Sequence, residues 1–219
     1  AAVTLARSLD TLEDLAPDLG TLLHRFGSRQ VRAQATLGGN IANGSPIGDL
    51  APALIALGAT LHLVGPDGER TMALEDFFID YGKQDRHPGE FVEAVSIPRQ
   101  PDRLRVYKLS KRFDQDISAV CGAFNLRTED DRVTEARIAF GGMAATPKRA
   151  SAAEAALNGQ PWSHESFEKA AAALARDFQP LSDWRASAEY RMLSAQNLLR
   201  RFFLEQDAHT EAPVQLAHA

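Results

Sequence analysis

A polar, glycine-rich stretch between residues 36 and 49 holds the side chains in this sequence that are best suited to chemistry. It reads Thr-Leu-Gly-Gly-Asn-Ile-Ala-Asn-Gly-Ser-Pro-Ile-Gly-Asp, and these residue types favour turns and local backbone bonds. Gly38 and Gly39 lack a Cβ, so the backbone could approach a ligand closely and its amides could donate to ligand oxygens. The side chains of Asn40 and Asn43 offer both donors and acceptors. The stretch therefore predicts a loop that binds a polar ligand, although paired glycines also occur in ordinary tight turns.

An acidic residue closes this stretch where a helix is expected to start. We expect Asp49 to cap a helix from about residue 50 to residue 57, which Gly58 ends. The first amides of a helix attract anionic ligand groups. The residues alone support a polar ligand loop and no narrower assignment.

The elements that must position this loop have an α+β pattern with a boundary near residue 101. Before it, we expect helices at 5–15 and 19–26, strands at 59–64 and 70–73, a short helix at 74–78 and a strand at 91–97. After Pro98 and Pro101, we expect strands at 104–111, 117–126 and 133–140, then helices at 150–157, 165–178 and 187–203. The sequence thus predicts a mixed unit at residues 1–101 and a three-stranded antiparallel sheet with a helical C-terminal part at residues 102–206. Residues 207–219 are predicted to form a flexible tail.

The composition of the chain excludes several classes of protein. Its 219 residues, 44% of them hydrophobic, can form one large or two small cores. A net charge of -5 without a basic stripe argues against nucleic-acid binding. No apolar run is long enough for a membrane span and no secretory signal is seen, so we expect a soluble, cytoplasmic protein. The single cysteine, Cys121, cannot hold an iron–sulfur cluster, and the six histidines are too scattered for a metal site.

Three motifs resemble those of one enzyme family. Residues 35–52 are similar to the "LGGN…SPxxD" loop of the FAD-binding domain in molybdenum hydroxylases, a family that includes xanthine dehydrogenase, aldehyde oxidase and the carbon monoxide dehydrogenase flavoprotein. Residues 107–118, followed by Ala-Phe-Gly-Gly-Met-Ala at 139–144, resemble the start of the family's C-terminal flavoprotein domain. The likeness covers roughly residues 26 to 203 and is close to the bacterial xanthine dehydrogenase small subunit.

The resemblance implies a set of FAD contacts. By position these are Phe26, Thr36, Gly38, Gly39, Asn40, Asp49, Val92 and Lys108. Phe26 would pack on the flavin ring, and the charge of Lys108 would favour the reduced, anionic flavin. Residues 109–119 align with a loop beside the flavin that controls access of the dinucleotide. No side chain is assigned a catalytic role, because the flavin carries the chemistry.

Some of these residues have a plainer interpretation. Phe26 could be a core residue at the end of an amphipathic helix, and Lys108 could be a lysine on the surface of a strand. Asp114 and Asp116, within a charged cluster, could lie near the flavin or form a solvated turn.

The resemblance also implies cofactors and partners. Electrons would pass from a molybdopterin centre through 2Fe-2S clusters to FAD and then to NAD⁺, during oxidation of a purine such as hypoxanthine or xanthine. The family's N-terminal iron–sulfur domain and the glycine-rich loop of its first FAD subdomain are absent from this sequence. We therefore expect these segments, and a molybdopterin-binding large subunit, to be partners.

Several alternatives stay open. Ala1 leads directly into a helical pattern, so we expect a portion of a longer polypeptide, although processing would also explain this start. A flavoprotein of the carbon monoxide dehydrogenase or aldehyde oxidase type would use another electron acceptor. A structural docking fragment would hold no cofactor of its own.

Overall fold

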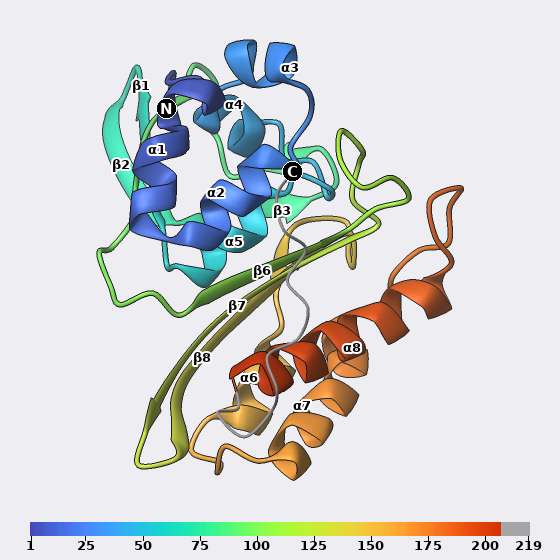
Figure 1. Cartoon of the computed structure of the whole chain (residues 1–219). Coiled ribbons are helices and arrows are strands. Elements are labelled where there is room, and N and C mark those ends of the chain that lie inside the picture. Colours follow the sequence, from blue (N-terminus) through green and yellow to red (C-terminus); the bar gives the residue numbers. More distant parts are fainter. Residues whose placement is uncertain (207–219) are drawn as a thin grey trace.

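Two units of secondary structure follow each other along the chain and meet at one antiparallel sheet (Figure 1). The structure is a computed structural model that describes residues 1–206, and the predicted tail at 207–219 lies outside the described residues. Within the described part of the chain, no helix is both long and apolar enough to cross a membrane.

The first unit combines short helices with a small sheet. Its elements are α1 (Leu5–Leu15), α2 (Pro17–His24), α3 (Arg29–Gln34), α4 (Leu37–Ala42), α5 (Leu50–Ala56), β1 (Thr60–Gly65), β2 (Gly68–Ala73), η1 (Leu74–Phe77), β3 (Phe78–Asp80), β4 (Lys83–Gln84) and β5 (Phe91–Ser96). β1 lies between β2 and β5 in an antiparallel sheet, and β3 pairs with β4. The predicted leucine-rich helices, hairpin and later strand are confirmed. The expected helix after residue 73 is a single 3-10 turn, and the six-residue helices α3 and α4 were too short to show a helical period.

The second unit is a twisted sheet with three helices on one side. Its elements are β6 (Leu104–Leu109), β7 (Val120–Glu129), β8 (Arg132–Gly141), β9 (Lys148–Arg149), α6 (Ser151–Leu157), α7 (His164–Asp177) and α8 (Ala188–Gln206). The strands are antiparallel in the order β6-β7-β8-β9. The three predicted strands and three predicted helices are present. The sheet has a fourth strand that the sequence did not predict, because a two-residue strand carries no alternation signal.

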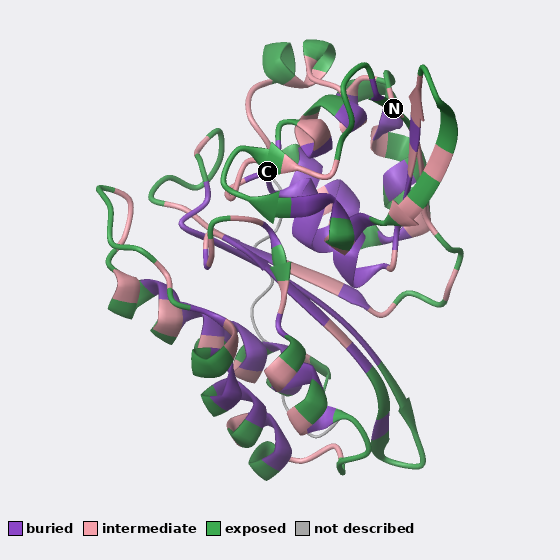
Figure 2. Cartoon of the chain, turned by 180° about the vertical axis from the view of Figure 1, so that it is seen from behind, coloured by how far each residue is buried: buried purple, intermediate pink, exposed green. Residues whose placement is uncertain are grey.

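Both faces of this sheet are covered along most of its length, which explains the continuous burial of residues 120–126 of β7 (Figure 2). Successive side chains of a strand point to opposite faces. Cys121 and Ala123 join the core of the first unit, whereas Val120 and Phe124 join the core formed with α6, α7 and α8. The small side chains on one face let a helix of the first unit approach closely, and the larger ones on the other face fill the space under the C-terminal helices.

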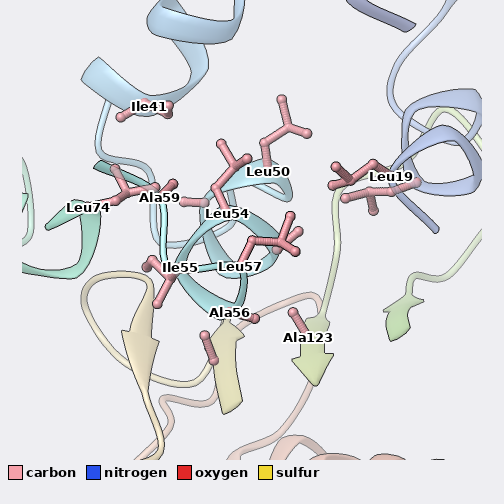
Figure 3. Close-up of a cluster of buried hydrophobic side chains, with 14 of the residues drawn as sticks. Leu19, Ile41, Leu50, Leu54, Ile55, Ala56, Leu57, Ala59, Leu74 and Ala123 are labelled. Atoms are coloured by element: carbon pink, nitrogen blue, oxygen red, sulfur yellow. The ribbon is translucent and has the colours of Figure 1, made fainter. Parts of the chain in front are cut away.

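Helix α5 is the element that comes so close to the sheet (Figure 3). All seven of its residues are buried. Leu50 and Leu54 pack in the first core, and Ala56 lies on the side of the helix nearest Ala123 of β7. A helix that is apolar all round belongs in a protein interior, so α5 is the shared centre of the two units.

Side chains of the second unit and the connecting segment fix the carboxyl-terminal end of α5. Arg137 of β8 donates to the Ile55 carbonyl at 2.7 Å, and Asn125 of β7 donates to the Ala56 carbonyl at 3.0 Å. Gln100 donates to the Leu57 carbonyl at 3.0 Å. These bonds satisfy acceptors that a helix end leaves open. With this end fixed, the opposite end of α5, where Asp49 lies, is held against β6.

Candidate functional site

The segment predicted to be an open ligand loop is partly helical. Residues 37–42 form α4, and the Thr36 hydroxyl accepts a hydrogen bond from the Gly39 amide at 3.0 Å. The Asn40 amide donates to the Thr36 carbonyl at 3.0 Å. The prediction of a loop is therefore wrong for this part, because a capping hydroxyl compensates for the low helix propensity of two glycines.

The first amides of α4 are bonded to the amino-terminal residues of the chain. The Leu37 amide donates to the Val3 carbonyl at 3.1 Å, and the Gly38 amide donates to the Ala1 carbonyl at 2.9 Å. A Cβ added to Gly38 would overlap the side chain of Ala1. The missing Cβ of Gly38 thus makes room for the chain's own first residue, and these amides are committed within the protein. Gly39, in contrast, is exposed.

A buried network of three polar side chains lies at the amino-terminal end of α5. Lys108 Nζ donates to Asp49 Oδ2 at 2.5 Å and to Ser118 Oγ at 2.8 Å, while Ser118 Oγ donates to Asp49 Oδ1 at 2.5 Å. The side chains of Lys108 and Asp49 are 2% and 5% exposed. The surface interpretation of Lys108 is therefore wrong.

The expected capping role of Asp49 is also wrong. Asp49 occupies the cap position of α5, but its side chain makes no capping hydrogen bond. Its carboxylate is turned to Lys108 of β6 and to Ser118 instead. A charged partner offers a stronger, charge-assisted bond than a backbone amide does.

The charges of this network cancel. The resemblance implies that the charge of Lys108 favours a reduced, anionic flavin, but the Asp49 carboxylate neutralises that charge at 2.5 Å. The effect of Lys108 on a flavin potential should accordingly be smaller than a lone lysine would produce. Burial, reinforced by the nearby Asp49 charge, raises the pKa of the Cys121 thiol well above its usual range. Cys121 is thus a protonated core residue without nucleophilic character.

An unsatisfied polar atom lies next to the network. Asn40 Oδ1 is buried and has no hydrogen-bond partner within residues 1–206. It lies 3.6 Å from where a Cβ on Gly48, the residue before Asp49, would stand. A buried acceptor without a donor costs about 1–3 kcal/mol. A ligand that supplied a donor here would remove that cost.

Arg25, the neighbour of Phe26, ties this aromatic segment to the strand that carries Lys108. Arg25 Nη1 donates to the Lys108 carbonyl at 2.9 Å, and Arg25 Nε donates to the Phe113 carbonyl at 2.9 Å. The guanidinium also stands 5.2 Å from the centre of the Phe113 ring, within range of a cation–π contact. Phe26 itself is half-buried against the first core, which supports its core interpretation, and its contact with a flavin stays a prediction.

Other residues singled out in the sequence do not belong to the network. Val92 is half-buried on β5 and packs against the first core. Asp114 is exposed. The Asp116 carboxylate accepts from the Arg112 amide at 2.9 Å, and this bond contributes most to a lowered pKa of Asp116. The exposure of Asp114 and the bonds of Asp116 within its own segment favour the turn interpretation, although the Asp116 side chain is only 12% exposed.

Sequence reasoning missed two residues of the site. Ser118 ends the motif at 107–118 but offered no spacing or charge that would mark it. Arg25 precedes Phe26, and an arginine beside an aromatic residue has many roles. Both depend on contacts over 69 to 88 residues of sequence, which no local pattern contains.

The Thr36 cap leads to a testable prediction. Thr36→Ala removes the hydroxyl that accepts from Gly39, and we expect the free energy of unfolding to fall by about 1 kcal/mol. Thr36→Ser keeps the hydroxyl and should remain within about 0.5 kcal/mol of the wild type. Urea denaturation followed by circular dichroism would measure both. Equal losses in the two variants would show that the methyl group matters and the cap does not.

Comparison with known proteins matches both units of the chain. Residues 1–100 match the model of the "FAD binding domain in molybdopterin dehydrogenase", and residues 105–206 match the "CO dehydrogenase flavoprotein C-terminal domain". The xanthine dehydrogenase FAD-binding subunit of Escherichia coli O157:H7 is 31% identical over 91% of this chain and 69% of the subunit. Nicotinate hydroxylase of Emericella nidulans is 34% identical over 87% of the chain. In carbon monoxide dehydrogenase from Oligotropha carboxidovorans, one chain superposes with a TM-score of 0.84 at 30% identity, covering 91% of this chain and 71% of that one.

The chain belongs to the FAD-binding flavoprotein family of the molybdenum hydroxylases. It spans 15% of the length of the nicotinate hydroxylase and 69% of the xanthine dehydrogenase subunit. The predicted α+β fold and the predicted family are both confirmed.

Two residues outside α5, Asn40 of α4 and Phe26 after α2, have side chains that fit a flavin. Asn40 provides a buried acceptor that the described protein leaves unused, and Phe26 provides a partly accessible ring. A cavity of about 230 Å³ lies instead at the carboxyl-terminal end of α5, beside Leu57 and Gly58. The fit to FAD therefore rests on Asn40 and its neighbours and not on that cavity.

Proposed function

We propose that this chain forms part of a FAD site in an oxidoreductase complex of the molybdenum hydroxylase type. The observation that carries the proposal is the buried network of Asp49, Lys108 and Ser118. It joins residues from both family-matched segments at one point, next to the unused acceptor of Asn40. Buried polar networks are expensive unless fully satisfied, so their presence at a domain junction favours a binding role.

Four of the proposed contacts have tasks suited to their residue types. The proposed FAD contacts are Phe26, Thr36, Gly39, Asn40, Asp49, Val92 and Lys108, whereas Gly38 holds α4 against the amino-terminal residues. Phe26 would cover an apolar ring face, and the Asn40 carbonyl would accept a hydrogen bond from the ligand. Asp49 and Lys108 would hold each other in fixed positions at the domain junction. When bound, FAD supplies two-electron chemistry, and the protein supplies orientation and a defined electrostatic environment.

The proposed reaction of the whole complex is purine oxidation with NAD⁺ as the electron acceptor. It is supported by 31% identity to a protein named as a xanthine dehydrogenase FAD-binding subunit. A molybdopterin-binding large subunit and an iron–sulfur domain would be its partners. Electrons would reach this chain from those partners and leave it for NAD⁺.

A second candidate is a flavoprotein that uses another acceptor. The likeness to a carbon monoxide dehydrogenase chain, with a TM-score of 0.84, favours it. Stopped-flow reoxidation of the reduced complex would separate the two. We expect rapid reoxidation by NAD⁺, and rapid reaction with oxygen without a reaction with NAD⁺ would support the second candidate.

A docking role without a cofactor is the third candidate, and flavin binding tests it directly. The absorbance spectrum of the purified complex, and titration of the chain with FAD, should show bound flavin. Absence of flavin from both preparations would contradict the proposed FAD site and support a docking role.

Phe26 provides a sharper test of the flavin site. We expect Phe26→Ala to raise the Kd for FAD by at least about tenfold, or 1.4 kcal/mol, and to lower the free energy of unfolding by only about 1–2 kcal/mol because the ring is half-buried. Leu9→Ala is the matched control, since Leu9 is also half-buried against the same core. It should lose similar stability and keep its FAD affinity. Equal effects of the two substitutions on affinity would leave Phe26 with a core role alone.

A further inference from the structure

A buried arginine of α8 reaches across the second unit to the segments that carry the network. Arg191 is 3% exposed. Its Nη1 donates to the Gly142 carbonyl at 3.0 Å and also to the Ala119 carbonyl. Its Nη2 donates to both carboxylate oxygens of Asp183 at 2.8 Å. One planar guanidinium thus ties together three segments that are far apart in the sequence.

Two of these bonds hold residues that are connected to Asp49 through one further contact. Ala119 follows Ser118, whose hydroxyl donates to the Asp49 carboxylate. Gly142 donates its amide to the Pro46 carbonyl at 2.7 Å, and Pro46 lies three residues before Asp49 in the turn that follows α4. The two routes therefore both end at residue 49, one through the Ser118 hydroxyl and the other along the backbone from Pro46.

The protein keeps this arrangement at a cost. Arg191 Nε is buried and has no hydrogen-bond partner within residues 1–206, and burying an unpaired donor is unfavourable. A guanidinium placed only for stability would be expected to use all of its donors. Its orientation is set instead by two backbone carbonyls, which accept from Nη1, and by the Asp183 carboxylate, which accepts from Nη2.

We infer that Arg191 is a positioning residue for the flavin site. It holds residues 119 and 142 in place, so that Ser118, Asp49 and Lys108 keep the arrangement that FAD requires. Arg191 touches none of these three side chains and acts through the backbone on either side of them. This inference rests on the proposed function, which it deepens by extending the site to α8.

The test compares Arg191→Lys with Arg200→Lys in the full chain. Arg200 is on the same helix and forms an ion pair with Glu168 at 2.6 Å, far along α8 from residue 191. The first readout is amide hydrogen exchange without FAD, at residues 118–119 and 142 and, as a reference, in α7. The second readout is the Kd for FAD. Asp183→Asn serves as a milder variant should Arg191→Lys fail to fold, because the Asp183 side chain is 42% exposed.

We expect Arg191→Lys to raise exchange at residues 118–119 and 142 by at least about tenfold while α7 stays as in the wild type, because only local opening is affected. The Kd for FAD should also rise at least about tenfold, and Arg200→Lys should change neither quantity more than about twofold. Unchanged exchange or unchanged affinity in folded Arg191→Lys would overturn the inference, as would an equal rise in exchange across α7. A wild-type chain and complex that bind no FAD would contradict the proposed function, while the exchange readout would still decide whether Arg191 orders these segments.

Discussion

Replacing Lys108 by methionine is expected to lower the free energy of unfolding by about 3–5 kcal/mol, because removing one partner of a buried ion pair leaves the other charge without compensation. In the variant, the Asp49 carboxylate would keep only the Ser118 hydroxyl as a partner, in a site where its side chain is 5% exposed. The carboxylate must then move, and the turn before α5 moves with it. FAD retention should be lost together with that geometry. Urea denaturation and the flavin absorbance of the purified protein would measure the two effects.

A double variant separates the charge from the packing. Asp49→Leu combined with Lys108→Met replaces the pair by apolar side chains, and such exchanges are often neutral or stabilising. We expect it to regain most of the lost stability without regaining FAD. The exposed pair of Lys169 and Glu165, at 2.7 Å, provides the control, because Lys169→Met should cost no more than about 1 kcal/mol. A loss below about 1 kcal/mol for Lys108→Met would contradict the assignment of a buried, mutually dependent pair.

The fold could be predicted from the sequence wherever a local pattern determined it. Long periodic segments such as 5–15 and 165–178 predicted their helices within a few residues. Their polar faces meet water and their apolar faces meet a core, so the pattern records the burial. Two-residue strands and six-residue helices were missed because tertiary contacts hold them. β9, for example, exists because its two residues pair with Ala139 and Phe140 of β8.

The site was predictable only in part. The motif resemblance indicated Asp49 and Lys108 independently, and the structure brings them together across 59 residues of sequence. The resemblance could not show that they neutralise each other, because charge compensation depends on distance. It also could not find Arg191, which reaches Ala119 over 72 residues. Local patterns report what a residue type can do, whereas its partner is decided by the fold.

Replacing Gly142 by alanine is the second substitution for which a large loss is expected. Gly142 has a φ of 80°, a conformation that costs a residue with a Cβ about 1–2 kcal/mol. The added Cβ would also stand under 3.0 Å from the Ala119 carbonyl oxygen and 3.1 Å from Arg191 Nη1. Backbone atoms cannot yield cheaply, so overpacking should add roughly 1–3 kcal/mol. We expect a total loss of about 3 kcal/mol in the free energy of unfolding, measured by thermal or urea denaturation.

Gly159 allows the two causes to be separated. Its φ is 78°, almost that of Gly142, yet no heavy atom of residues 1–206, its chain neighbours aside, lies within 4 Å of the position that its Cβ would take. Gly159→Ala should therefore show the conformational cost alone, about 1–2 kcal/mol, with unchanged affinity for FAD. The excess loss in Gly142→Ala measures the displacement of Ala119, and we expect the Kd for FAD to rise with it because Ser118 is the adjacent residue. If the two alanine variants lose the same stability, the close approach of residues 142 and 119 does not exist in solution. If Gly142→Ala shows the excess loss of stability but binds FAD as tightly as the wild type, the contact between residues 142 and 119 supports the fold and not the flavin site.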